Sequence, residues 1–154
     1  MISRITRRLV LAAPALTLLA TPAIAGPIPA GKDAYLYFIS PRDRQRIRGS
    51  VRVRFGLRNM GVAPAGVRTP NTGHHHLLVD VSEPLDPGAP IPQDKNHLHF
   101  GAGQTEALID LPPGPHKLQL VLGDADHVPF DPPLVSKPIH VTVLPTATAP
   151  SQKR

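Results

Sequence analysis

The sequence predicts an all-β protein, a single immunoglobulin-like antiparallel β-sandwich of about seven strands. Several segments alternate apolar and polar residues with a period of two, the pattern of a strand that buries one face. The 154 residues include 20 prolines and 12 glycines, which divide the chain into short pieces without a helical period. Parallel βαβ units are excluded because the pieces leave no room for crossover helices.

The expected strands follow one another along the chain. The alternation is clearest in residues 51–58, where Val51, Val53 and Phe55 are separated by arginines. The other expected strands cover residues 34–40, 74–81, 105–111, 116–122 and 139–143, and residues 96–100 are also strand-like. The proline-rich stretch from Ser82 to Gln104 predicts an ordered surface loop, because structureless loops of this length are usually functional or mobile.

The first 25 residues predict an export signal. Arginines near the start are followed by an apolar run over residues 9–20 and by the small-x-small pattern Ala23-Ile24-Ala25, with Gly26 as the expected mature N-terminus. The pair Arg7-Arg8 also matches a twin-arginine signal, so the general secretory route and the twin-arginine route both stay open. We therefore expect a periplasmic or secreted protein.

The remaining chain predicts one domain between two short ends. We expect a linker over residues 26–33, the sandwich over 34–144 and a disordered tail over 145–154. The apolar run of the signal is shorter than the ~20 residues that a membrane helix needs, and no other segment could span a membrane, so we expect no integral membrane protein. Removal of the three signal arginines lowers the formal charge from +6 to +3, and the lack of cysteine excludes disulfides.

Histidines are the main functional signal. Five of the eight fall in two short windows, Thr72–Asp80 (TGHHHLLVD) and Asn96–Phe100 (NHLHF). Alternate side chains of a strand share a face, so His74 and His76 point together while His75 points away with Leu77. His97 and His99 have the same spacing. Two such pairs, brought together, would offer four imidazoles, which suit Cu(II) or Zn(II).

A third group, Asp124, Asp126 and His127, falls in the turn after an expected strand. The candidate metal site therefore comprises His74, His76, His97, His99, Asp124 and His127. A structural network of polar side chains is the competing interpretation, and the sequence leaves both open. We expect His75 to be a hydrogen-bonded core histidine, and His116 and His140 to be surface or packing residues.

Arginines form a second pattern. Seven of them share one parity: Arg42, Arg44, Arg46, Arg48, Arg52, Arg54 and Arg58. One basic stripe could attract anionic lipid headgroups, lipopolysaccharide or acidic glycans, although a solvated face that protects an edge strand from aggregation gives the same pattern. We expect no nucleic-acid binding, because the protein is expected to be exported and no aromatic side chains alternate with these charges.

Catalytic motifs are not recognisable. The chain contains no GxSxG, no phosphate-binding glycine loop and no cysteine nucleophile. We therefore expect a non-enzymatic exported binding module, with the clustered histidines as a possible copper or zinc site. The alternative is a cell-envelope interaction protein that uses its arginine face on an anionic polymer or a protein partner.

Several segments resemble a bacterial envelope family, the domain-of-unknown-function family numbered 4399. They are GLRNMGVAPAGV (56–67), NTGHHHLLVD (71–80), HLHFGAGQTE (97–106), LPPGPHKLQLVLGD (111–124) and HVPFDPP (127–133). The resemblance covers nearly all of residues 34–143 and implies a small exported β domain without an established activity. Phe130 stands where a histidine is common in the family pattern, which weakens the expectation that this turn supplies a complete metal site.

Overall fold

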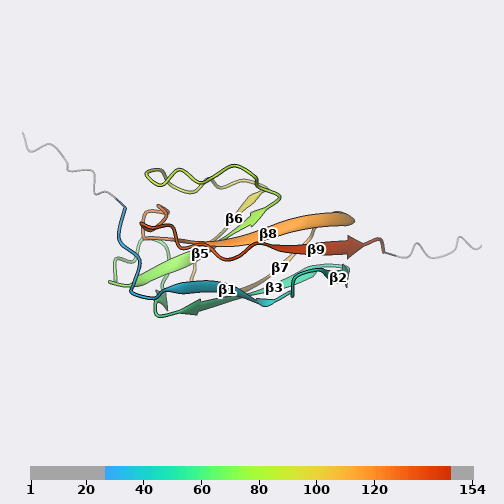
Figure 1. Cartoon of the computed structure of the whole chain (residues 1–154), viewed down its shortest axis with the longest axis horizontal. Helices are drawn as coiled ribbons and strands as arrows, with labels where there is room; N and C mark the ends of the chain where they lie inside the picture. The colour runs from blue at the N-terminus through green and yellow to red at the C-terminus, as the bar shows by residue number, and fades with distance from the viewer. Residues whose placement is uncertain (1–26, 147–154) are drawn as a thin grey trace, which may run out of the picture.

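The computed structural model describes residues 27–146, and the secondary structure in this range consists of strands and turns (Figure 1). The expected signal peptide (1–25) and residues 147–154 of the expected tail lie outside the described residues. Within the described range, no helix could cross a membrane. The strands are β1 (Tyr35–Ser40), β2 (Gln45–Arg48), β3 (Val51–Arg58), β4 (Gly61–Val62), β5 (Thr72–Val79), β6 (His97–Phe100), β7 (Glu106–Ile109), β8 (Gly114–Gly123) and β9 (Ile139–Leu144).

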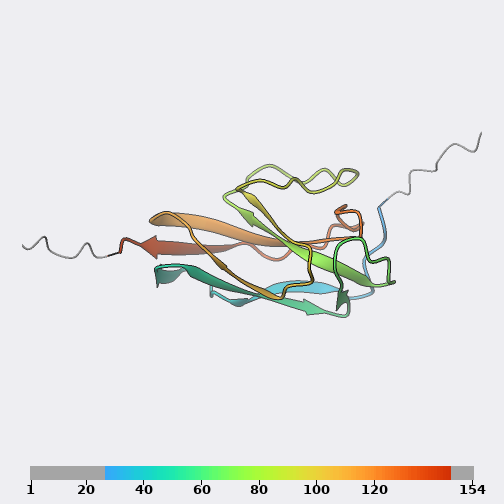
Figure 2. The ribbon, with the colours of Figure 1, turned by 180° about the vertical axis from the view of Figure 1, so that it is seen from behind.

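The strands form two packed sheets, which confirms the predicted β-sandwich. One sheet has the order β1-β3-β7, and the other has the order β2-β9-β8-β5-β4 with β6 also paired to β5. Figure 1 shows the two sheets edge-on, with the segment between β5 and β6 lying over the large sheet on the side away from β1 and β3. The view from behind shows the same arrangement (Figure 2). The molecule therefore has three layers: the small sheet, the large sheet and a covering loop.

The core lies between the sheets and is built by the alternating residues. Val51, Val53 and Phe55 of the small sheet are almost fully buried, as are Leu77 and Leu120 of the large sheet. Burial of an aliphatic side chain of this size contributes about 1.5–3 kcal/mol. A second, smaller apolar cluster on the other face of the large sheet comprises Leu78, Val81, Ile91 and Val121. The covering loop supplies Ile91 and therefore packs against the sheet.

Two short strands were not expected and make parallel pairs. β2 pairs with β9 and β4 pairs with β5 in parallel, whereas the other pairs are antiparallel as predicted. β2 also corrects the idea of one continuous arginine stripe. Arg46 and Arg48 lie on β2 in the large sheet, whereas the arginines of β3 belong to the small sheet. The turn at Gly49, which has a φ of 79°, takes the chain from one sheet to the other.

Buried His116 and partly exposed Asp80 form a polar pair that ties the covering loop to β8. His116 Nδ1 lies 2.8 Å from an Asp80 carboxylate oxygen, and His116 Nε2 lies 2.8 Å from the Pro112 carbonyl oxygen. The other Asp80 oxygen accepts the Lys117 amide at 2.8 Å. Burial alone would lower the pKa of His116, but the hydrogen bonds to Asp80 and Pro112 outweigh it and raise this pKa. His116 is thus a packing residue, as expected, and each of its ring nitrogens faces a hydrogen-bond acceptor, which favours the protonated ring.

Asp80→Asn should weaken this pair while preserving the left-handed backbone (φ 58°), which asparagine tolerates. We expect the free energy of unfolding to fall by about 1–2 kcal/mol near pH 6. This loss of stability should become smaller as pH rises above 6.5 and through the raised folded-state pKa of His116, because His116 then loses its charge. It should also become smaller as pH falls below 3.8 and through the lowered pKa of Asp80, because the carboxylate is then protonated. Urea unfolding across this range measures it, with Asp110→Asn on exposed Asp110 as the control; equal effects of the two variants would contradict the prediction.

Candidate metal centre

The candidate site lies on the outer face of the large sheet, where β5 is flanked by β6 and β8. Strand register places His76 between His99 of β6 and Val121 of β8. His74 lies opposite Gly123 of β8 in the next row. His75 has the opposite parity and packs in the core, with its ring 4.9 Å from the Phe55 ring. The predicted division of the three consecutive histidines between two faces is therefore observed.

Four imidazole rings pack against one another on this face: those of His74, His76, His99 and His127. The His74 ring centroid lies 4.8 Å from that of His76, 5.0 Å from that of His99 and 4.9 Å from that of His127. The His99 and His127 centroids are 4.7 Å apart. The His99 ring lies 5.0 Å from that of His76 as well, so His74 and His99 are each within 5.0 Å of the other three rings.

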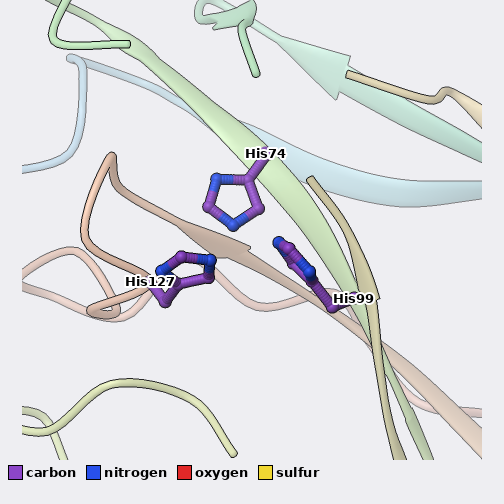
Figure 3. A group of neighbouring side chains, drawn as sticks. All are labelled: His74, His99 and His127. Carbon is purple, nitrogen blue, oxygen red and sulfur yellow. The ribbon is translucent and has the colours of Figure 1, made fainter. Parts of the chain in front are cut away.

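Three of these rings direct nitrogens toward a common space. His74, His99 and His127 each contribute one ring nitrogen to this space, and these three nitrogens all lie within 4.8 Å of one another. Figure 3 shows the three rings turning nitrogens toward the space that they enclose. His76 approaches from the side, with its Nε2 3.0 Å from the Nε2 of His74. The arrangement therefore consists of a converging triad, His74, His99 and His127, with the fourth imidazole, His76, hydrogen-bonded to His74.

Two glycines provide the room for these rings. A Cβ atom on Gly101 would lie 2.3 Å from Cε1 of His99, and one on Gly123 would lie 3.0 Å from Nε2 of His76. Both distances are too short for an ordinary contact with a methyl group. In HFGAG the glycine thus accommodates the ring of its own segment's histidine, His99, whereas in VLGDADH it accommodates the ring of His76 on β5.

His127 reaches the group from a turn that its own backbone and Asp124 hold in place. One Asp124 carboxylate oxygen accepts the amides of Asp126 and Val128 at 2.8 and 2.9 Å. Asp126 in turn accepts two hydrogen bonds of 2.7 Å from the Arg68 guanidinium. His127 itself has a φ of 69°, an uncommon conformation that the surrounding bonds support. Asp124 therefore positions the turn, and its carboxylate is not one of the converging donors.

The covering loop closes over the same region. The Ile91 amide donates a 2.8 Å hydrogen bond to the His127 carbonyl oxygen, and the Ile91 side chain is 3% exposed against the large sheet. His74 and His76 have no exposed surface. The expected ordered loop is thus a lid-like layer that keeps water from two of the four imidazoles.

A family model described as a domain of unknown function, DUF4399, matches residues 53–144 of this sequence. The chain belongs to this family. The matched residues include all four histidines of the group. Among curated proteins, none matches the chain.

A solved structure described as fibronectin(III)-like modules of CbhA from Clostridium thermocellum is similar to the DUF4399 domain. The similarity covers 71% of this chain and 93% of that one, with 13% sequence identity and a TM-score of 0.32.

The DUF4399 domain brings together four of the six residues proposed from sequence. His97 lies opposite Leu78, one row beyond His76 and His99. Its Nδ1 lies 2.9 Å from an Asp94 carboxylate oxygen, so including it among the converging donors was wrong. Parity alone places His97 and His99 on the same face but does not say how far each lies along the sheet, and His97 pairs with Leu78, one row beyond the group.

Two residues near the group have other roles. Phe130 is 2% exposed and belongs to the apolar core. His75 is a core residue as expected, but neither of its buried ring nitrogens has a hydrogen-bond partner among the described residues. Burial lowers the pKa of His75 to about 4 and outweighs the Gln104 backbone, which lies near enough to raise this pKa. The contact of His75 with the Phe55 ring makes it an apolar packing element of the DUF4399 core.

Burial keeps three of the grouped histidines neutral. Together with the neighbouring imidazoles, it lowers the pKa of His74 to about 4 and that of His76 to about 3. Burial and the proximity of His127 also lower the pKa of His99. Neutral imidazole carries the lone pair that binds a metal ion. These side chains are therefore in the ligating form well below neutral pH.

Nuclear magnetic resonance titration of the ring nitrogens should distinguish the buried histidines from His116. We expect His74 and His76 to stay neutral at pH 5, where His116, with its raised pKa, is protonated. Because the unfolded chain takes up protons near pH 6.5 and the folded group does not, stability should fall as pH drops from 6.5 toward 4. Protonation of His74 and His76 near pH 6.5 would contradict the buried geometry.

Proposed function

We propose that this DUF4399 domain is an exported β-sandwich module that binds a divalent transition metal, copper or zinc, through its histidine group. His74, His99 and His127 are the three principal ligands, and His76 is available as the fourth. The observation that carries the proposal is the convergence of the three rings, with nitrogens within 4.8 Å of one another. Tetrahedral coordination at 2.0–2.1 Å places ligand nitrogens about 3.3 Å apart, so a small contraction of the group would suffice.

The hydrogen bonding of the group favours metal binding over a purely structural network. Three buried ring nitrogens, Nδ1 of His74, Nδ1 of His76 and Nε2 of His99, have no hydrogen-bond partner among the described residues. A buried polar group without a partner costs about 1–3 kcal/mol, and structural networks usually satisfy their members. A group of four imidazoles held together at this cost is well explained if a metal ion stabilises the folded domain.

The donor set selects the class of metal. All the converging donors are imidazole nitrogens, whereas calcium and magnesium require oxygen ligands. Imidazole suits zinc, copper and nickel, and among divalent ions copper binds nitrogen sites most tightly. We therefore propose that the site binds Cu(II) most tightly and Zn(II) less tightly.

His76 would change partner when the metal binds. In the structure its Nε2 shares a hydrogen bond with Nε2 of His74. If His74 used this nitrogen for the metal, the hydrogen bond would be lost and the Nε2 of His76 would be free as a fourth donor. The short separation of 3.0 Å means that a small rotation of the His76 ring would be enough.

The metal proposal is tested by calorimetric titration of Cu(II) and Zn(II) into the protein without an affinity tag. We expect one ion per chain, and His99→Ala/His127→Ala should weaken binding by more than about 100-fold, because even outer hydrogen-bond partners contribute 10–100-fold. The matched control, His97→Ala/His140→Ala, also removes two histidines but leaves the group intact. Equal binding by the two double variants would overturn the site.

Gly101→Ala offers an independent test that retains every ligand. The new Cβ would displace the His99 ring, which can rotate without moving the strand. We expect weaker metal binding with little change in stability, because the affected group is a side chain. Gly88→Ala is the control, since its Cβ would meet only an Asp86 carboxylate oxygen at 3.7 Å. Unchanged affinity in Gly101→Ala would exclude His99 as a ligand.

Export of the domain is supported by the arginine-bearing start, the apolar run and the Ala23-Ile24-Ala25 pattern. We expect mass spectrometry of the protein from the cell envelope to find Gly26 at its N-terminus. Replacement of Arg7 and Arg8 by lysine should block export only if the twin-arginine route is used. An envelope protein that keeps Met1 would contradict cleavage.

A further inference from the structure

The outer face of the small sheet, opposite the histidine group, carries a second concentration of functional side chains. Tyr35 and Tyr37 of β1 share this face with Arg52, Arg54 and Arg58 of β3, and we call these five residues the tyrosine–arginine face. Register pairs Tyr35 with Arg58, and Tyr37 with Gly56. The face is built from two strands that pair along their length, so its side chains have fixed relative positions.

The two tyrosines form a stacked pair at the surface. Their ring centroids are 5.3 Å apart, and the ring planes differ by 15°. The Tyr37 ring leans over Gly56, where a Cβ atom would lie 2.4 Å from ring carbons. Gly56 lies between Arg54 and Arg58 among the outward residues of β3, so the Tyr37 ring sits beside two guanidinium-bearing positions. Tyr35 is 49% exposed and presents an open aromatic surface.

The charge around the pair is positive. Glu106 is shared by Arg52 and Arg54, at 3.3 and 3.4 Å, so one carboxylate faces two guanidinium groups. Beyond the tyrosines, a hollow of about 270 Å³ is lined in part by Arg42, Asp43 and Lys137. On or just beside this face, the cationic side chains outnumber the acidic ones: they are Arg42, Arg44, Arg52, Arg54, Arg58 and Lys137 against Asp33, Asp43, Glu106 and Asp110. Arg52 and Arg54 remain more than half exposed and can donate to a ligand.

We propose that the tyrosine–arginine face binds an acidic polysaccharide. A sugar ring has an apolar face that can stack on tyrosine, and the carboxylate of an acidic sugar matches the planar fork of arginine. Along β3, Arg54 lies about 7 Å from Arg52 and about 14 Å from Arg58, at 3.3–3.4 Å per residue. A polymer with one charge on each repeating unit contacts such a row at several points, whereas a single small anion reaches only one.

The geometry favours a polysaccharide over a membrane surface. The tyrosines are stacked on each other and Tyr37 leans over Gly56, whereas side chains that anchor in a bilayer reach into its headgroup region. The arginines lie in line along one strand rather than on an amphipathic helix. Binding to anionic vesicles is therefore a distinct outcome, and the experiment includes it.

The test measures binding of the tag-free protein to immobilised polygalacturonate, with neutral dextran as the comparison polymer. We expect binding to polygalacturonate that weakens with salt and no binding to dextran. Arg54→Gln/Arg58→Gln should raise Kd about tenfold or more, because charge-assisted bidentate contacts are lost. Tyr35→Leu, which keeps an apolar side chain at an exposed position, should raise Kd about fivefold through loss of the aromatic surface.

The matched control is Arg46→Gln/Arg48→Gln, which removes the same charge from β2 in the other sheet. We expect less than about a threefold change, since only general electrostatic attraction is reduced. An equal rise in Kd for the two double variants would mean that binding depends only on net charge, and would overturn the proposed binding role of the tyrosine–arginine face. Binding to vesicles of phosphatidylglycerol but not to polygalacturonate would also overturn the proposal, and unfolding curves of each variant check that the fold is retained.

Discussion

The structure depends on the burial of β5 on both of its faces. Its inner face packs Leu77 and Val79 into the core, and its outer face lies under the covering loop and the turn at His127. A strand buried on both sides is usually a continuous apolar run. In β5 three of the buried positions are histidines, His74, His75 and His76, with no exposed surface. The properties of the histidine group follow from the burial of these polar side chains away from water.

The buried histidines are accommodated differently on the two faces. His75 faces the core, where its ring packs on Phe55 as a neutral aromatic group. His74 and His76 face the covering layer, where His99 and His127 surround them with more imidazole rather than with carboxylates or carbonyl groups. A polar network that is only partly satisfied is costly at low dielectric. A metal ion would turn the same arrangement into a stabilising one, because it would bind nitrogens that are already desolvated and neutral.

The sandwich separates two surfaces that could work independently. The histidine group lies on the outer face of the large sheet, and the tyrosine–arginine face lies on the outer face of the small sheet. The apolar core stands between them. A module of this design could hold a metal ion on one side while the other side contacts an acidic polymer. The arginines that sequence parity joined into one stripe are divided between the two sheets and the turn before β2. Those of β3 share a face with the tyrosines, and Arg42 lines a hollow beside them.

The period-two alternation of residues 51–58 and 116–122 determined the sandwich, because one face of each strand had to be buried. The same rule correctly separated His75 from His74 and His76. This rule does not predict position along the sheet, and it is the pairing of β6 with β5 that places His99 in the group and His97 outside it. The bonds that hold the turn at Asp124 decided that His127 completes it. Parity is a local property of the chain, whereas the convergence of rings from β5, β6 and the turn after β8 depends on strand register and loop packing, which only the tertiary structure sets.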